Sequence, residues 1–150
     1  MAPPNKTQAV ILDDRAQALA LYPHARIVRA AEGDKTVFVS GISSRRFDNT
    51  HAGVTVHADG RVDKDIKAQT EAVLENIRVI LRAAGAELEN VVDMTVFLTD
   101  MKDYAGMNEV YNRYFNQETG PTRTTVGVRE LPHPNLLVEM KAIAFVGDAP

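Results

Sequence analysis

The chain has 150 residues, 45% of them hydrophobic and 25% charged, which is the composition of one soluble globular domain covering residues 1–150. A formal net charge of −3 argues against nucleic-acid binding, and the absence of cysteine excludes disulfides, thiolate nucleophiles and sulfur metal ligands. Because the sequence shows neither an apolar run long enough to span a membrane nor the pattern of a signal peptide, we expect a cytoplasmic protein without membrane contacts.

The N-terminal segment predicts a loose end, then a strand and a short helix. Residues 1–8 are polar and rich in proline, which is typical of a loosely ordered terminus. Residues 10–21 favour a strand that leads into a helix, with Asp13 or Asp14 as the N-cap. This helix should end before Pro23, because the residue preceding a proline avoids the helical region.

A hairpin, a polar loop and a short strand are predicted next. Strands at residues 27–28 and 36–41 are joined by a turn around Gly33. Residues 42–50 are polar and irregular, which indicates a loop. Residues 53–57 alternate between apolar and polar side chains and predict a short strand.

The strongest helix signal lies at residues 66–84. Apolar and small side chains recur there at spacings of three and four, the period of a helix with one buried face. Asp63 or Asp65 can cap its start, and Gly85 suits the position just past its end. The periodic positions are Ile66, Thr70, Val73, Ile77, Leu81 and Ala84.

A second helix is predicted at residues 103–115. Tyr104, Met107, Tyr111 and Tyr114 form one stripe along it. We expect this stripe to pack on the sheet, and the alternative is an aromatic surface that faces a ligand.

Three further strands are predicted at residues 91–98, 124–130 and 136–146. The last of them is apolar at both alternating sets of positions, so both faces of its sheet are expected to be buried. Self-association is the economical way for so short a chain to bury the second face. Two long helices among about six strands predict an α+β domain in which both helices pack on one face of a mixed sheet.

Arg123 stands at the start of a predicted strand, just after a Gly-Pro step. Its guanidinium group cannot lose its charge at neutral pH, and its planar fork suits a carboxylate. Arg123 is therefore a candidate receptor for an anionic substrate, and the alternative is a salt bridge at a strand end.

Glu139 lies within the apolar final strand. Buried carboxylates are rare unless they are paired, and burial raises their pKa toward the range that is useful for proton transfer. Glu139 is therefore a candidate general acid/base. The alternative is a structural ion pair with Arg123 or Lys141.

Four segments resemble, in order and in spacing, the Rid family of reactive intermediate deaminases, also called the YjgF family. They are residues 90–100, 107–111, 120–128 and 136–146, within a resemblance that runs from about residue 37 to residue 146. The resemblance implies a chorismate-mutase-like fold. It also implies homotrimers, or dimers of trimers, whose sheets close into a barrel with active sites in the clefts between subunits.

The same resemblance implies roles for individual residues. Arg123 matches the carboxylate-binding arginine of the family and Glu139 its water-positioning glutamate, so these two are the expected catalytic residues. Ser40 and Gly41 match a strand end that lines the same cleft, where glycine permits a close approach between backbone and ligand. Asn108, in the second matching segment, is expected as a further substrate contact.

Three positions depart from the family pattern. Thr125 replaces a cysteine found in many members, although its backbone N–H can still bind a substrate carboxylate. His24 stands where many members have a tyrosine, and Lys141 replaces a second acidic residue. Each departure puts the usual substrate, a small 2-imino acid, in question.

Paired arginines, Arg45 and Arg46, follow shortly after the Ser40-Gly41 step. This loop and residues 22–26 resemble the 2-aminomuconate deaminase branch of the family. 2-Aminomuconate is a dicarboxylate, so it needs a second cation at some distance from Arg123. The alternatives are a solvated basic loop or a salt bridge between subunits.

No metal and no cofactor are expected, because His51, His57 and His133 lack the spacing of a metal site and no phosphate-binding glycine loop is present.

Together with the resemblance, the sequence predicts a hydrolytic deaminase of an enamine or imine carboxylate, which converts 2-aminomuconate to 4-oxalocrotonate and ammonia in the degradation of aromatic compounds. One alternative is a general 2-imino acid deaminase acting on compounds such as 2-iminobutyrate. The other is a non-enzymatic ligand-responsive regulator or chaperone-like protein.

Overall fold

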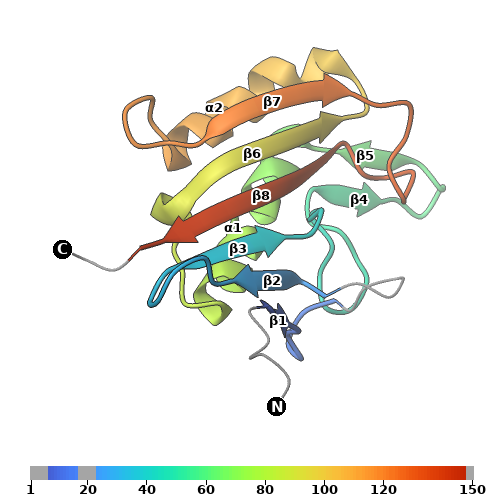
Figure 1. Ribbon diagram of the computed structural model, residues 1–150. Helices are drawn as coiled ribbons and strands as arrows, with labels where there is room; N and C mark the ends of the chain where they lie inside the picture. Colours follow the sequence, from blue (N-terminus) through green and yellow to red (C-terminus); the bar gives the residue numbers. More distant parts are fainter. Residues whose placement is uncertain (1–6, 17–22, 148–150) are drawn as a thin grey trace.

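The computed structural model describes residues 7–16 and 23–147. Within these residues, a six-stranded sheet has the order β1-β2-β3-β8-β6-β7, and a separate hairpin consists of β4 and β5 (Figure 1). The strands are β1 (Thr7–Val10), β2 (Ala25–Val28), β3 (Lys35–Val39), β4 (Val54–Val56), β5 (Val62–Lys64), β6 (Val91–Leu98), β7 (Thr122–Gly127) and β8 (Val138–Val146). The helices are α1 (Ile66–Ala83) and α2 (Tyr104–Tyr114), with 3₁₀ turns at Leu88–Asn90 and Met101–Asp103.

The sheet is mixed. β6 and β7 pair in parallel, and the other neighbouring strands of this sheet pair antiparallel. A parallel pair needs a crossover connection, which α2 supplies between β6 and β7. Both helices lie on one face of the sheet (Figure 1), so the predicted α+β class is confirmed.

α1 forms where the sequence periodicity predicts it. The Asp65 side chain accepts hydrogen bonds from the backbone N–H groups of Lys67 and Ala68, which satisfies donors that the first turn leaves open. Gly85 has a φ of +73°, as expected for a glycine just after a helix end. The buried residues of α1 are Gln69, Thr70, Val73, Leu74, Ile77, Ile80 and Leu81.

The predicted stripe of α2 is divided between two environments. Met107 and Tyr111 are buried, as expected. Tyr114 turns to α1, where its hydroxyl donates to Glu75 at 2.8 Å. Tyr104 is 39% exposed and lies at the sheet edge beside Arg123. The expectation that the whole stripe packs on the sheet is therefore wrong for these two tyrosines.

The N-terminal prediction is also corrected. Residues 11–16 are irregular, and residues 17–22 of the predicted helix lie outside the described residues. The imidazole of His24 accepts from the N–H of Leu12 and donates to the carbonyl of Ala16, so a tertiary contact takes up backbone groups that a helix would use. The terminus that was expected to be loose to residue 8 includes the first residues of β1.

The hairpin around Gly33 is confirmed, since β2 and β3 pair antiparallel across it. β7 ends at Gly127 instead of continuing to residue 130, because its partner β6 ends at Leu98. β8 begins two residues later than predicted, and β5 has no counterpart among the predicted strands.

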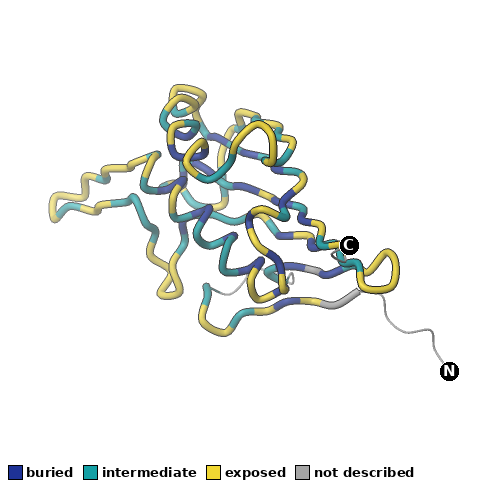
Figure 2. Tube along the Cα trace, turned by 90° about the vertical axis from the view of Figure 1, so that its left-hand side faces the viewer, coloured by how far each residue is buried: buried dark blue, intermediate teal, exposed yellow. Residues whose placement is uncertain are grey.

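The two faces of the sheet differ in the single chain. Val138, Met140, Ala142 and Ala144 of β8 point to the helices and are fully buried. The other side, which we call the open face, carries large apolar side chains that are 38–42% exposed: Phe38, Val126 and Phe145. Figure 2 shows the buried positions gathered in the interior of the fold. The expectation that both faces are buried does not hold within one chain.

The core of β6 provides a test of this assignment. Met94 is fully buried, whereas Val92, two residues earlier, is 49% exposed. Met94→Ala should lower the free energy of unfolding by about 2–5 kcal/mol, because it leaves a cavity under the helices. Val92→Ala should change it by about 0.5 kcal/mol or less. Denaturant titration of both variants checks this, and equal effects would contradict the assigned faces.

Candidate functional site

A cavity of about 230 Å³ opens where β3 ends and β8 begins. Five of the nine residues singled out in the sequence line it: His24, Ser40, Gly41, Arg45 and Glu139. The loop at residues 43–51, the loop at 132–136 and one side of α1 complete the wall. Its volume is nearly eight times the ~30 Å³ that one water molecule takes up in the liquid, so it can accommodate a small organic molecule.

Glu139 is the acidic group of this cavity. It is half-buried, and burial raises the pKa of its carboxyl group above the usual value for glutamate. Within the described residues no ion pair joins it to Arg123 or Lys141, so the structural alternative does not apply to the single chain. A carboxyl group whose pKa burial raises, at the wall of a cavity, is a candidate for proton transfer.

Gly41 has a specific reason to be glycine. A Cβ atom at this position would lie 2.9 Å from Oε2 of Glu139, which is closer than real Cβ contacts come. The absence of a side chain therefore lets the carboxylate lie against the backbone. The close approach that the sequence predicted for a ligand is made here by Glu139.

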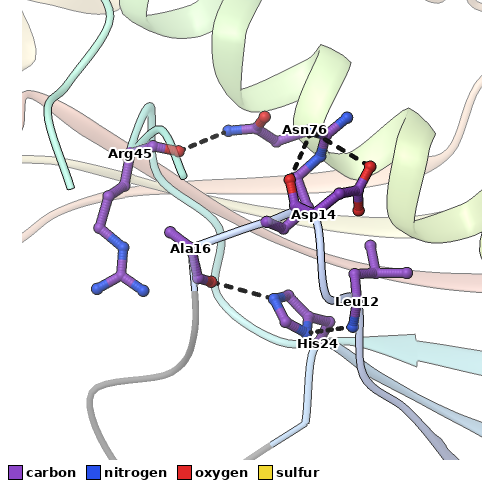
Figure 3. Close-up of polar contacts among 7 residues, drawn as sticks. Leu12, Asp14, Ala16, His24, Arg45 and Asn76 are labelled. Atoms are coloured by element: carbon purple, nitrogen blue, oxygen red, sulfur yellow. Dashed lines mark hydrogen bonds and ion pairs between the residues drawn. The ribbon is translucent and has the colours of Figure 1, made fainter. Parts of the chain in front are cut away.

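His24 and Ser40 hold the cavity wall together. His24 bridges the backbone of Leu12 and Ala16, as Figure 3 shows. The Ser40 hydroxyl donates to the Pro23 carbonyl at 2.6 Å, and the Ser40 N–H donates to the His24 carbonyl at 3.1 Å. Both side chains thus line the cavity while their polar atoms bind the backbone.

Arg45 and Arg46 lie in different environments. Arg45 is half-buried and lines the cavity. Arg46 is exposed, and its guanidinium group donates to the hydroxyl of Thr50 at 3.2 Å on the outside of the loop. The cavity of the single chain is thus lined by Arg45 and not by Arg46, and a substrate contact by either arginine stays a prediction.

Arg123 lies in a second cluster at the edge of the sheet. Its guanidinium carbon is 4.6 Å from the ring centroid of Tyr111 and 5.7 Å from that of Tyr104. One of its terminal nitrogens donates to the Tyr104 hydroxyl at 3.2 Å. Stacking on aromatic rings orients the fork while its charge is retained.

Thr125 and Asn108 belong to this second cluster. Thr125 follows Arg123 by two residues and shares its side of the strand, and Asn108 lies on the face of α2 that carries Tyr104 and Tyr111. The Thr125 hydroxyl, the Asn108 carbonyl oxygen and the Tyr111 hydroxyl are buried without a hydrogen bond inside the described part of the chain. Buried polar atoms usually have partners, so this cluster is suited to receive a polar group.

The structure separates Arg123 from Glu139. Arg123 pairs with Met94 on the helix side of the sheet, whereas Glu139 pairs with Phe97 on the open face. Across the sheet, Glu139 lies two strands away from Val126, and Val126 follows Arg123 by three residues along β7. With about 4.8 Å between strands and about 3.3 Å per residue, the two backbones lie about 14 Å apart. One subunit cannot place both side chains on the same reacting carbon.

Three residues in or beside the cavity were not assigned a role from the sequence. His51 and His133 stack with ring centroids 4.3 Å apart, although 82 positions separate them in the chain. Asn76 projects from α1 to the 43–51 loop. No local sequence signal predicts these contacts, because they depend on packing between distant segments.

Two further features are absent from the described residues. No group of three or more histidine, cysteine, aspartate or glutamate side chains is arranged to hold a metal ion there. No helix in the same part of the chain is long and apolar enough to cross a membrane.

The family model described as Endoribonuclease L-PSP matches residues 17–146. The chain belongs to the Rid (YjgF) family. A Rid-fold crystal structure of the yeast protein YEO7 superposes with a TM-score of 0.76 at 33% identity, covering 92% of this chain and 97% of that one. The resemblance seen in the sequence is thereby confirmed at the level of family and fold.

Two curated Rid relatives show how far the likeness extends. A RutC family protein of Pyrococcus abyssi is 52% identical over 84 residues, which cover 56% of this chain and 65% of the relative. TdcF of Escherichia coli, named as a reactive intermediate deaminase, is 41% identical over 87 residues, 57% of this chain and 67% of its own. The crystal structure of TdcF with bound serine has a TM-score of 0.69 at 31% identity, covering 91% and 98% of the two chains.

His51 makes the stability of this Rid domain dependent on pH. Burial, His133, Arg45 and Arg46 all lower the pKa of His51. Below the ordinary histidine pKa of about 6.5, the unfolded chain therefore binds a proton that the folded chain does not, and stability falls as pH falls.

When the pH falls from 8 to 5.5, the free energy of unfolding should decrease less in His51→Asn than in the unsubstituted protein. Thermal unfolding at both pH values measures this, and pH 8 serves as the reference because His51 is neutral in both states there. A parallel loss in the two proteins would contradict the assignment.

Proposed function

We propose that this Rid protein is a hydrolytic deaminase of imines and enamines that carry a carboxylate beside the reacting carbon. The observation that carries the proposal is the half-buried Glu139 carboxyl group, whose pKa burial raises, at the wall of a cavity of ligand size. The name of the E. coli relative, a reactive intermediate deaminase, supports the same reaction class.

The chemistry requires one proton acceptor and one orienting cation. An enamine substrate first tautomerises to its imine, and Glu139 takes a proton from water as the water oxygen bonds to the imine carbon. That proton passes to nitrogen, which gives a carbinolamine. The hydroxyl proton of the carbinolamine then moves to nitrogen through Glu139 as the C=O bond forms and the C–N bond breaks, so that ammonia and a 2-oxo acid leave. Proton transfer of this kind contributes about 10²–10⁴-fold to a rate, and orientation of the substrate supplies more.

Arg123 is the proposed receptor for the carboxylate next to the imine. Because it lies about 14 Å from Glu139 in the same chain, we assign the two residues of one site to different subunits. Arg123 lies on β7, which is an edge strand of the sheet. The guanidinium group of Arg123 can therefore reach the cavity of a neighbouring copy. The exposed apolar side chains of the open face are suited to bury against that copy, and a homotrimer, or a dimer of trimers, is the proposed assembly.

2-Aminomuconate is the proposed substrate because the cavity holds a second cation. Arg45 lines the same cavity as Glu139 and can bind the distant carboxylate of a dicarboxylate. A general 2-imino acid deaminase has no need for this charge. A ligand-responsive binding protein would in turn have no need for a carboxyl group with a raised pKa.

Glu139→Gln tests the catalytic role. The substitution keeps the shape of the side chain and removes its basicity, so turnover of 2-aminomuconate should fall by about 10²-fold or more. Ammonia release measures turnover, and light scattering verifies the assembly. Unchanged turnover in Glu139→Gln would mean that Glu139 has a structural role. If the unsubstituted protein releases no ammonia from either 2-aminomuconate or 2-iminobutyrate, the result would favour a binding protein.

Complementation tests the shared site. Arg123→Ala and Glu139→Gln chains should each be nearly inactive alone, but mixed oligomers made by co-expression should recover activity. About a quarter of the sites in a randomly mixed trimer receive Arg123 from one subunit and Glu139 from the next. A mixture that stays inactive although mixed oligomers form would contradict a site divided between subunits.

The two neighbouring arginines form a matched pair for the substrate assignment. Arg45→Ala should weaken transition-state binding of 2-aminomuconate by about 1.5–3 kcal/mol and leave 2-iminobutyrate nearly unaffected, as expected for a lost charge-assisted hydrogen bond. Arg46→Ala is the control, because that side chain binds Thr50 outside the cavity. Equal losses of kcat/KM on the two substrates would contradict the dicarboxylate assignment.

A further inference from the structure

The loop at residues 43–51 carries Arg45 but contains little regular structure. One isolated antiparallel bridge joins Arg45 to His51. At the tip, the N–H of Arg46 donates to the Thr50 carbonyl at 2.7 Å, and both residues are exposed. Contacts inside the loop thus shape its tip, and the stack of His51 on His133 joins its end to the loop at 132–136.

Asn76 attaches the start of this loop to α1. It is half-buried on α1, and its side-chain nitrogen donates to the Ser43 carbonyl at 3.0 Å and to the Arg45 carbonyl at 3.3 Å. An amide nitrogen has two hydrogens, so both are used on the loop backbone. Asparagine has a low intrinsic helix propensity, and α1 itself therefore gains nothing from it. Figure 3 shows the contact, with the Arg45 side chain extending away from Asn76.

The attachment lies at Arg45, the arginine that lines the cavity. Arg45 is held at its carbonyl by Asn76 and at its N–H by the Ser43 hydroxyl at 3.3 Å. In an extended segment, neighbouring side chains point to opposite sides. Fixing the backbone of Arg45 therefore directs its side chain inward and sends that of Arg46 outward.

We propose that Asn76 is a positioning residue that sets Arg45 as the second anion receptor and so makes the site selective for substrates with two anionic groups. The proposal rests on the proposed function, because it assumes that Arg45 binds the distant carboxylate. Asn76 has no role in the reaction at the imine carbon, so a substrate with one carboxylate should be indifferent to it.

Kinetics with both substrates test this role. Asn76→Ala should lower kcat/KM for 2-aminomuconate by about tenfold, chiefly through KM, as expected for the loss of two ordinary hydrogen bonds, and should leave 2-iminobutyrate within about twofold. Asn76→Asp keeps the shape but removes both donors, so it should behave like the alanine variant. Asn76→Gln retains the amide donors and should keep part of the selectivity. Glu71→Ala, an exposed change on the same helix, is the control.

A double-mutant cycle with Arg45→Ala distinguishes a failure of the positioning role of Asn76 from a failure of the proposed function. If Asn76 acts through Arg45, then Asn76→Ala should have no further effect on 2-aminomuconate once Arg45 is removed. Additive losses, or equal losses on both substrates, would show a merely structural Asn76 and overturn the inference. If Arg45→Ala itself shows no substrate selectivity, the dicarboxylate assignment fails first, and the inference falls with it.

Hydrogen exchange tests the positioning role of Asn76 without a measurement of activity. Amide protons at residues 43–52 should exchange faster in Asn76→Ala than in Glu71→Ala, while those of β8 stay protected in both. Unchanged exchange in the loop would overturn the positioning role. If the alanine variant does not fold, the same comparison is made with Asn76→Asp and Asn76→Gln.

Discussion

The pairing of β8 with both β3 and β6 is the constraint on which the candidate site depends. Its buried positions, such as Met140, face the helices, so Glu139 must face the other way. The bridge between Ile42 and Met140 then brings Gly41 against the Glu139 carboxylate. A register shift of one residue would turn every side chain of β8 over and place a carboxylate in the core, which is costly without a partner. The packing of the core thus fixes the position of the proposed acid/base.

α1 contributes to the site without bringing any charged group to it. Two of its amide side chains bind the loops that form the cavity wall, Asn76 the backbone of residues 43–45 and Gln69 the backbone of residues 135–137. Gln69 is fully buried, and its side chain both donates to and accepts from that loop. A helix therefore positions irregular segments that the substrate would otherwise have to order at a cost in entropy.

In the proposed reaction, the two clusters have different roles. The Glu139 cavity is built from β3, β8 and their loops, and the Arg123 cluster from β7 and α2. Tyr104 and Tyr111 stack with Arg123, so its fork is oriented before any carboxylate arrives. Because the clusters lie on opposite faces of the sheet, the proposed reaction ties catalysis to assembly. An isolated subunit would hold half of two sites.

Local signals in the sequence determined the two long helices, the hairpin and most strand positions, because hydrophobic periods and turn residues act over a few neighbours. The family followed from the resemblance of four segments. Glu139 also stood out there, as a carboxylate within an apolar strand. Only the tertiary structure shows that Arg45 lines the cavity while Arg46 lies outside it, and that Asn76, 31 residues away on a helix, contacts the loop. It also brought His51 to His133. Such contacts join segments that no sequence period links, and the packing of the whole fold decides which of them form.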